Sequence, residues 1–401
     1  MTLVTKYFNC NILREGKIVA EDLWVDNGQI ANPEVIFYDK KKNPDIEIDC
    51  LGSLIIPGLI DLQINGAFGI DFTHDSGEGL EVVRKGLLQY GVTAFCPTIV
   101  STTSLNYRKI LPKLKRCHGS QQGAAILGAH VEGPFISNLK LGAHNMSNIK
   151  TLEDNNLFNT YGSLENIGIV TLAPELDGSM EAIKILSNKG IVVSLGHTST
   201  NMETSLQAIQ NGASFITHLF NAMVPFHHRE PGLLGLITCL PSDEKPIFFG
   251  IIADGTHTHP AALKIAHSVN PKGLVLVTDA ISAIGLPDGI HHLGDEQIEV
   301  KNSKAYIANT NTLCGSMTFL DECMRYFISS TNCSIVEAIE AVTLHPAQVL
   351  GIQHCKGTLN YGADADFVLL GTKLNVQSTW INGKCVFEHK NKPGYIMKKT
   401  T

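Results

Sequence analysis

Short apolar runs recur along the middle of the chain, and each is followed by a polar or glycine-rich turn. Eight of these runs are rich in Val, Ile, Leu and Phe and lack strict alternation: Leu54–Leu62, Thr93–Val100, Ala124–Val131, Gly168–Ala173, Ile191–Leu195, Ser214–Thr217, Pro246–Ala253 and Gly273–Thr278. Continuous apolar runs are typical of parallel strands covered on both faces. Helices are predicted between them, including Gly79–Tyr90, Leu105–Cys117, Ser179–Lys189 and Met202–Asn211.

Eight strands that alternate with helices predict an α/β fold, a (β/α)8 TIM-like barrel, over residues 56–354. A doubly wound sheet is the rival fold, but no GxGxxG motif follows the first strand. The two ends, residues 1–55 and 355–401, instead hold short strand-like pieces separated by turn signals such as Asn382-Gly383. We expect both ends to join into one small β-sandwich domain beside the barrel.

Composition narrows the class of protein. The 401 residues include 44% hydrophobic and 17% charged residues, which predicts a globular chain rather than a disordered one. The net charge of −7 argues against a nucleic-acid binder, since such proteins carry a basic patch. No stretch approaches the roughly 20 apolar residues that span a bilayer, and residues 1–17 lack the apolar segment of a signal peptide. The ten cysteines form no CxxC pair, which favours reduced thiols in a cytoplasmic protein.

Polar residues stand where the predicted strands end, and in a barrel these ends converge on one rim. Glu132 follows the third run, His197 the fifth and His218 the sixth. Two imidazoles and one carboxylate, with a fourth position open to water, are typical of a catalytic divalent-metal site. Asp279, at the end of the last run, could take a proton from the attacking water and pass it to a leaving amine.

Each of these residues also has a structural interpretation. A single histidine at a strand end is often only a hydrogen-bonded core residue, Glu132 could cap a helix or pair with an arginine, and Asp279 could be a helix N-cap. The pairs His227-His228 and His291-His292 have no strand ahead of them, and we interpret them as solvated loop residues. The four rim residues together favour chemistry more strongly than any one of them alone.

An ordered series of motifs resembles the N-acetylglucosamine-6-phosphate deacetylases, a family of the amidohydrolase superfamily. The motifs are PGLIDLQINGAFG (57–69), AHVEGPFIS (129–137), KLGAHN (140–145), LAPE (172–175), SLGHTS (194–199), THLFNAM (217–223), REPGLLG (229–235), ADGTHTHP (253–260), LVTDAI (276–281), LCGSM (313–317) and KGTLNYGADADFVLL (356–370). Single motifs such as GHT are weak, but the full series in this order is specific and covers most of the chain.

The resemblance implies the activity and the role of each site residue. It implies that Glu132, His197 and His218 bind the metal and that Asp279 is general base and then general acid. It implies hydrolysis of N-acetyl-D-glucosamine 6-phosphate to glucosamine 6-phosphate and acetate. It further implies that His144 assists at the substrate carbonyl and that contacts to the phosphosugar fall on Ala143, His144, Asn221, Ala222, Asp254, His257, Leu313, Cys314 and Gly315. Arg229 is similar to the family's phosphate ligand, and a homodimer with the phosphate pocket near its interface is expected.

One departure bears on the number of metal ions. Many amidohydrolases carry His-x-His after the first strand, whereas this chain has Gln63-Ile64-Asn65. Neutral amides are poor ligands for a zinc-like ion, so we expect one divalent ion per chain, which could be zinc, iron, cobalt or manganese. Two rivals stay open at this point. One is an amidohydrolase acting on a cyclic amide or an unphosphorylated sugar, and the other is a scaffold without chemistry, which would be expected to lack one of the four rim residues.

Overall fold

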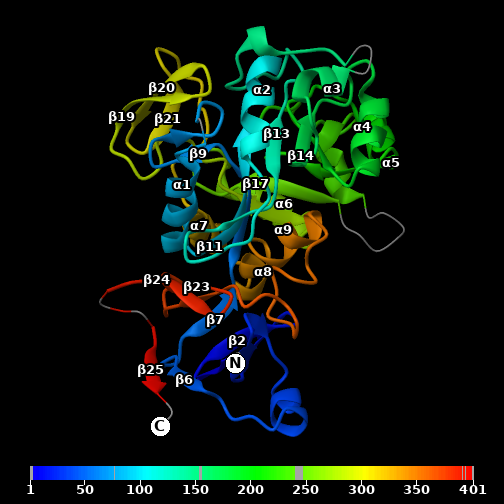
Figure 1. Ribbon diagram of the computed structural model, residues 1–401. Coiled ribbons are helices and arrows are strands. Elements are labelled where there is room, and N and C mark those ends of the chain that lie inside the picture. The colour runs from blue at the N-terminus through cyan, green and yellow to red at the C-terminus, as the bar shows by residue number, and fades with distance from the viewer. Residues whose placement is uncertain are drawn as a thin grey trace.

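The structure is a computed structural model that describes residues 3–75, 77–152, 156–239, 247–390, 392 and 394–399. A barrel of eight parallel strands, in chain order, fills the middle of the molecule (Figure 1). The strands are β8 (Leu59–Ile64), β11 (Val92–Ile99), β13 (Ala129–Glu132), β14 (Ile167–Leu172), β15 (Val192–Leu195), β16 (Ala213–Ile216), β17 (Phe248–Ile252) and β18 (Leu274–Val277). The predicted barrel is confirmed, and each of the eight apolar runs overlaps one of these strands; the first residue of the seventh run, Pro246, lies outside the described residues.

Burial on both faces explains why these strands are continuously apolar. Every residue of β8, β11 and β14 is buried. Side chains that point inward fill the barrel, among them Ile60, Leu62, Cys96, Ile169, Phe215 and Val275. Side chains that point outward pack beneath the surrounding helices in the largest hydrophobic cluster. Neither face of these three strands meets water, so they need no polar alternation.

The first apolar run divides into two strands that belong to different sheets. β7 (Leu54–Pro57) joins the sheet made from the chain ends, whereas β8 begins the barrel after Gly58. The backbone at Gly58 passes so close to Thr93 that a Cβ atom would lie 2.0 Å from its Oγ1. Glycine is therefore required where the chain passes from one sheet to the other.

The barrel closes between its first and last strands near their carboxyl ends. The backbone N–H of Asp279 donates to the carbonyl oxygen of Gln63 at 2.8 Å, and that of Asn65 donates to Ala280 at 2.7 Å. Ile64 and Ala280 form an isolated parallel bridge at the same level. These contacts place the side chains that follow β8 and β18 next to each other.

Lower in the barrel, a segment from the C-terminal half of the chain lies between the same two strands. The N–H of Ile60 donates to the carbonyl oxygen of Val342, and that of Leu276 donates to Ala341, both at 2.9 Å. At this level the first and last strands are thus bridged by residues that follow α8 (Ile335–Glu340) and do not bond to each other. We call this junction between β8 and β18 the seam. Near the carboxyl ends the two strands bond directly to each other, and lower down each bonds to Ala341 or Val342 instead.

Short helices surround the barrel. Among the described helices, α7, for example, has 12 residues. They are α1 (Leu80–Gly86), α2 (Ser104–Ile110), α3 (Asn156–Tyr161), α4 (Ser179–Asn188), α5 (Met202–Gln210), α6 (Pro260–Val269), α7 (Leu320–Thr331), α8 (Ile335–Glu340) and α9 (Leu344–Val349). Side-chain caps fix several starts; Asn201, for example, accepts from the N–H of Thr204 at 2.8 Å ahead of α5. None of the described helices is long and apolar enough to cross a membrane.

The chain ends form two further sheets at the lower end of the molecule in Figure 1. One contains β1 (Val4–Phe8), β4 (Leu23–Asp26), β5 (Gln29–Ile30), β6 (Ile46–Asp49) and β25 (Ile396–Lys399). The other contains β2 (Asn11–Arg14), β3 (Lys17–Ala20), β7, β22 (Phe367–Leu370), β23 (Val376–Ile381) and β24 (Lys384–Glu388). Asn382 and Gly383 form the predicted hairpin turn, with φ of 51° and 69°. The domain limits 1–55, 56–354 and 355–401 stay a prediction.

Three aromatic side chains from both ends of the sequence pack in the core of this end region. The rings of Tyr7 and Phe367 lie 5.1 Å apart edge to face, and those of Tyr7 and Trp380 lie 5.2 Å apart. All three are buried in one cluster. Aromatic pairs in such arrangements contribute about 0.5–1.5 kcal/mol beyond the area they bury, so the two ends are joined by packing as well as by strand pairing.

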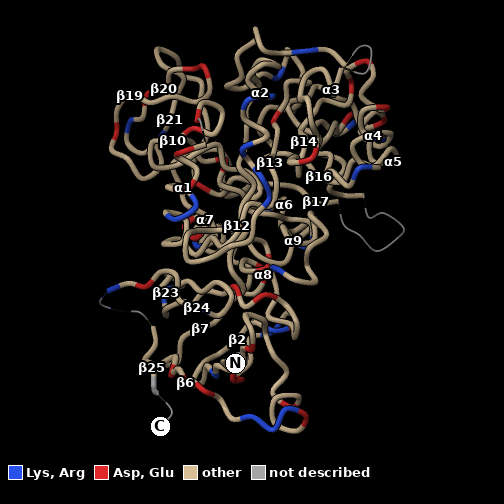
Figure 2. The backbone as a smooth tube through the Cα atoms, in the orientation of Figure 1, with Lys and Arg blue, Asp and Glu red and all other residues tan. Residues whose placement is uncertain are grey.

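Between β18 and α7, in chain order, the structure contains an antiparallel sheet that the sequence analysis did not predict. It comprises β19 (Gly289–Leu293), β20 (Glu296–Lys301) and β21 (Lys304–Ile307). The interpretation of His291-His292 as loop residues is therefore wrong, because both lie in β19. Their alternating exposure and the buried Leu293 show a strand with one face on a small core. Lys, Arg, Asp and Glu are interspersed here and elsewhere along the chain (Figure 2).

All ten cysteines are free thiols. Cys10, Cys50, Cys96, Cys314 and Cys323 are buried, and the other five are half-buried. Burial raises the pKa of Cys96 and of Cys314 to about 12, so both stay protonated at neutral pH. Neither thiol has the properties of a nucleophile.

We expect Lys356→Met to lower the free energy of unfolding by roughly 3 kcal/mol, because removing one member of a buried ion pair leaves the other uncompensated. Lys356 Nζ donates to Asp364 and Asp366 at 2.8 and 2.7 Å, and its side chain is 10% exposed. Denaturant unfolding measures the change. The control Lys301→Met breaks a surface pair with Glu299 and should cost less than about 1 kcal/mol. Equal losses for both variants would contradict a special role of Lys356.

Candidate active site

The predicted rim residues meet in a cavity of about 130 Å3 at the carboxyl ends of the barrel strands. Its lining contains most of the site residues expected from the sequence: Glu132, Ala143, His144, His197, His218, Asn221, Ala222, His257, Asp279, Leu313, Cys314 and Gly315. Asn65, Val100, Gly142 and Leu293 complete the lining. Two expected residues, Asp254 and Arg229, are not part of it.

Glu132, His197 and His218 lie close enough to share one ion. His197 Nε2 and His218 Nε2 lie 3.1 and 3.0 Å from Glu132 Oε1, and the two nitrogens are 3.0 Å apart. Ligands about 2.1 Å from a tetrahedral zinc-like ion stand roughly 3.4 Å from one another. The three atoms therefore already form nearly the face of such a coordination shell, and the donor set fits a divalent ion.

Hydrogen bonding sets the tautomer of His197 for this role. Its Nδ1 lies 2.9 Å from the carbonyl oxygen of Lys140, which can only accept, so the ring proton is on Nδ1. Nε2 then carries the lone pair that faces Glu132 and His218. A carbonyl partner on the outer nitrogen is the usual support of a metal-bound histidine.

Contacts with His197 and His218 keep the carboxylate of Glu132 ionised. Burial would raise the pKa of Glu132, but the contacts with His197 and His218 outweigh burial and hold it well below its ordinary value. Burial would likewise lower the pKa of His218, yet the contact with Glu132 raises it. A buried carboxylate that stays ionised among imidazoles is a ready ligand for a cation.

His144 is a second imidazole near the cluster, and its hydrogen bonds give it a different role. One ring nitrogen lies within 4.8 Å of ligand atoms of Glu132 and His197, so distance alone would admit His144 as a ligand. However, the backbone N–H of Ser101 donates to His144 Nδ1 at 3.1 Å. The proton of the neutral ring is then on Nε2, and burial, followed by the nearby imidazole of His197, lowers the pKa of His144 to about 3 and keeps the ring neutral. The hydrogen bonds therefore favour the predicted set, in which His218 and not His144 is the third ligand.

Asp279 is held by two amide side chains. Asn65 Nδ2 donates to Asp279 Oδ1 at 2.8 Å, and Gln63 Nε2 lies 3.3 Å from the same oxygen and 3.0 Å from Glu132 Oε1. Burial, then the charge of Glu132, raises the pKa of Asp279 to about 6. A carboxyl group whose pKa lies near neutrality suits both acceptance and return of a proton.

Three of the four rim residues have a strained backbone. His197, His218 and Asp279 have φ of 49°, 27° and 48°, in the left-handed region that non-glycine residues rarely adopt. Such strain costs on the order of 1–3 kcal/mol per residue and clusters at functional sites. Here it turns each side chain inward immediately after its strand.

Asp254 and Arg229 lie away from the cavity lining. Asp254 stands behind His257 and accepts from its Nδ1 at 2.7 Å, so it supports the ring rather than lining the cavity. Arg229 is exposed on the surface at residues 225–230. A single chain therefore does not bring Arg229 to the site, and its phosphate role stays a prediction.

Several lining residues were not named from the sequence. Gly142 stands in the KLGAHN motif, and a Cβ atom there would lie 3.1 Å from Cε1 of His197, so its place in that motif was the available signal. Val100 and Leu293 carry no such signal, since both are ordinary apolar residues. Leu293 reaches the cavity only because β19 packs beside it.

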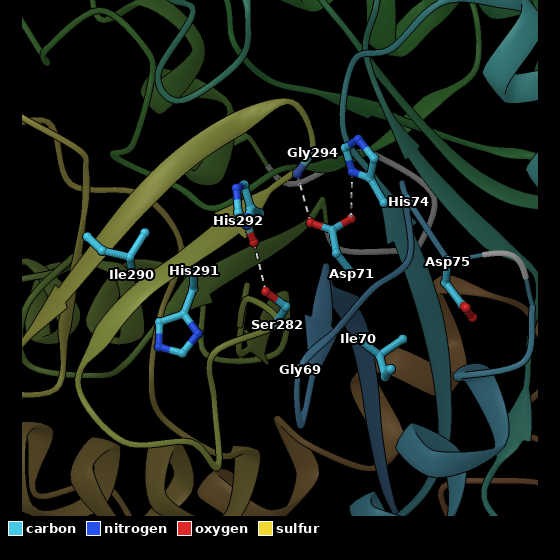
Figure 3. A pocket seen from close by; sticks show the side chains of 10 residues that line it. All are labelled: Gly69, Ile70, Asp71, His74, Asp75, Ser282, Ile290, His291, His292 and Gly294. Carbon is cyan, nitrogen blue, oxygen red and sulfur yellow. Dashed lines mark hydrogen bonds and ion pairs between the residues drawn. The ribbon is translucent and has the colours of Figure 1, made fainter.

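A larger cavity of about 520 Å3 lies between residues 69–75 and β19 (Figure 3). The carboxylate of Asp71 faces it but already accepts from the N–H groups of Thr73 and Gly294, both at 2.7 Å. Ser282 Oγ donates to the carbonyl oxygen of His292 at 2.7 Å. These groups fasten β19 to the barrel loops, so we place the chemistry in the smaller cavity despite its size.

Comparisons with known proteins identify the family of the chain. The amidohydrolase family matches residues 54–386. The N-acetylglucosamine-6-phosphate deacetylase of Bos taurus is 50% identical over 395 residues, covering 96% of each chain. The structure of the N-acetylglucosamine-6-phosphate deacetylase of Thermotoga maritima gives a TM-score of 0.83 at 29% identity and covers 96% of this chain and 100% of its own. A variant of the Mycobacterium smegmatis enzyme, in complex with N-acetyl-D-glucosamine-6-phosphate, gives 0.83 at 25% identity, with 96% and 99% covered.

Proposed function

This chain belongs to the amidohydrolase family and, within it, to the N-acetylglucosamine-6-phosphate deacetylases; from that premise we propose how it performs the reaction. The substrate is N-acetyl-D-glucosamine 6-phosphate, and the products are D-glucosamine 6-phosphate and acetate. The convergence of Glu132, His197 and His218 beside Asp279 is the observation that carries the proposal. A scaffold without chemistry would have no need of this cluster.

One divalent ion would be held by Glu132 Oε1, His197 Nε2 and His218 Nε2. Such an ion supplies polarisation of the amide carbonyl and lowers the pKa of water towards neutrality. Gln63 and Asn65 occupy the positions where a second pair of histidines would stand, and both donate hydrogen bonds to carboxylates instead. This use of the two amides supports a single ion per chain.

Asp279 performs the proton transfers. Its carboxylate takes a proton from the water that attacks the acetamide carbon, and the Asn65 amide keeps Oδ1 oriented while it does so. As the carbon–nitrogen bond breaks, the same proton passes from Asp279 to the leaving amine. The amine leaves neutral, and the acetic acid that forms keeps the oxygen and the second proton of the water and then ionises to acetate by releasing that proton to solvent.

His144 donates to the oxygen that becomes negative. The fixed tautomer puts a proton on Nε2, and the ring lines the cavity. A preorganised donor of this kind can be worth about 3–4 kcal/mol in the transition state. Sugar contacts are proposed for Ala143, Asn221, Ala222, His257 and the segment Leu313–Gly315, all of which line the cavity.

Arg229 is proposed to bind the phosphate, with its planar guanidinium matched to phosphate oxygens. Because Arg229 is exposed and outside the cavity lining, the proposal places the phosphate pocket near a homodimer interface. A cytoplasmic setting is part of the same proposal, since the substrate is a phosphosugar.

An acetate-release assay tests the function. We expect wild-type protein to release acetate from N-acetylglucosamine 6-phosphate far faster than from N-acetylglucosamine. Arg229→Ala should lower kcat/KM for the phosphorylated sugar by roughly 100-fold, as expected for a lost charge-assisted pair, and change the unphosphorylated sugar little. Arg108→Ala, on the outer face of α2, is the control. Equal losses of kcat/KM on both sugars in Arg229→Ala would mean that Arg229 does not bind phosphate. If the wild-type protein did not prefer the phosphorylated sugar, the proposed substrate would be wrong.

A further inference from the structure

Asp61 is a buried carboxylate that the proposed chemistry does not use. It lies on β8 and is 1% exposed. Its hydrogen-bond partners are neutral: Oδ1 accepts from the N–H groups of Gln63 and Thr278 at 3.2 and 3.3 Å, and Oδ2 accepts from Thr278 Oγ1 at 2.6 Å. Burial raises its pKa to about 7. Burying a carboxylate without a cation costs free energy, so we expect Asp61 to have a role that offsets this cost.

Asp61 sits at the seam, between the two kinds of closing contact. Above it, the backbones of Gln63 and Asp279 are joined directly, and below it, Ile60 bonds to Val342 instead of to β18. The carboxylate accepts hydrogen bonds from a backbone N–H of each strand, at Gln63 and at Thr278. At this height in the barrel these two N–H groups have no ladder bond between β8 and β18. The carboxylate acts as a side-chain replacement for the missing ladder bonds.

The hydroxyl of Thr278 extends this contact into the turn that carries Asp279. Thr278 Oγ1 donates to Asp61 and accepts from the N–H of Ala280 at 3.2 Å. It therefore spans the turn on both sides of Asp279, whose φ is 48°. On the opposite side, Ser316 Oγ donates to the carbonyl oxygen of Thr278 at 2.6 Å. These side chains hold the strained turn together with backbone hydrogen bonds, since the N–H of Asp279 donates to Gln63 and its carbonyl oxygen accepts from Ser316, both at 2.8 Å.

We propose that Asp61 and Thr278 are positioning residues for Asp279, holding its strained turn at the seam so that its carboxylate faces the metal cluster. Neither residue lines the cavity, so they act through Asp279 and not on the substrate. The inference rests on the proposed function, because it concerns the geometry of the general base. A carboxylate suits the position because three donors converge on its two oxygens.

Thr278→Val is the direct test, since it removes the hydroxyl while nearly keeping the shape. We expect kcat to fall about 10- to 100-fold, because displacing a catalytic group by around 1 Å can cost on the order of 100-fold. KM and the metal content should stay within about 3-fold, since the cavity lining and the cluster are untouched. Thr278→Ser keeps the hydroxyl and should retain kcat within about 3-fold of wild type.

Thr379→Val is the matched control. Its buried hydroxyl donates to the carbonyl oxygen of Leu88 at 2.7 Å, in the end region of the molecule. Thr379→Val should lower the free energy of unfolding by about as much as Thr278→Val does, and it should keep the wild-type kcat. If folded Thr278→Val also kept the wild-type kcat, the positioning role would be overturned and only a structural one would remain.

Asp61→Asn provides an independent measurement, which also serves if Thr278→Val fails to fold. An amide presents a donor instead of an acceptor to Thr278 Oγ1, so the hydroxyl loses its 2.6 Å bond to the carboxylate and has to turn towards the carbonyl oxygen of Gln63 at 3.2 Å; kcat should fall with little change in KM. The double variant should be no slower than the slower single variant, because both remove one contact; additive losses would overturn the proposal. Asp279→Asn is assayed in parallel. If it is inactive, the proposed function stands whatever the seam variants show.

Discussion

Asp279→Asn should turn over N-acetylglucosamine 6-phosphate roughly 1,000-fold more slowly than the wild type, since general acid–base catalysis contributes about 10²–10⁴-fold. Asparagine can still accept the hydrogen bond from Asn65 that the carboxylate accepts now. It cannot take a proton from water or return one to the amine. Acetate release at saturating substrate measures the loss, and KM should change little because the shape is kept.

Metal content separates this effect from damage to the site. Asp279→Asn should retain its ion, because Asp279 is not among the three atoms of the cluster. Asp288→Asn, at an exposed turn where the carboxylate accepts from Asn302 N–H, is the control and should keep the wild-type kcat. Turnover near the wild-type rate in Asp279→Asn would refute the proton transfer assigned to this residue.

His197→Asn should abolish both metal binding and acetate release. The asparagine amide can replace Nδ1–H towards the carbonyl oxygen of Lys140, but it has no counterpart of Nε2, which faces Glu132. Losing one of three protein ligands should lower affinity by at least 100-fold, more than the 10- to 100-fold typical of an outer partner. Elemental analysis should find about one ion per wild-type chain and almost none in the variant.

His345→Asn is a matched control for that substitution. His345 is also buried, and its Nδ1 lies 2.7 Å from the carbonyl oxygen of Leu274, at the opposite end of β18 from the cavity. This variant should keep its ion and its turnover. Removing the ion from wild type with a chelator should stop acetate release, and adding it back should restore it. Two ions per wild-type chain would contradict the single-ion proposal for Gln63 and Asn65.

The barrel and the rim could be predicted from the sequence because each depends on local pattern. Two-sided burial makes every barrel strand an apolar run, and the rim residues are polar where such runs stop. His144, Leu313, Cys314 and Gly315 do not directly follow a strand predicted from the sequence, so only the resemblance to a family indicated them. The structure places all four in the cavity.

Other features depend on contacts between distant segments and leave little trace in the sequence. The run at Leu54–Leu62 is continuous, yet Gly58 divides it between two sheets. The tautomer of His144 is set by a backbone N–H of Ser101, which every residue except proline possesses. The strand that carries His291 is short and half-exposed, so its pattern resembles that of a loop.

The two sheets formed by the chain ends also set the order in which the molecule folds during synthesis. β7 lies between β2 and β22, and β6 lies between β1 and β25. The partners β22 and β25 emerge from the ribosome about three hundred residues after the strands they cover. Until then the nascent chain exposes open strand edges, which are sites of aggregation. A growing chain of this protein should therefore need a chaperone until its last strands are translated.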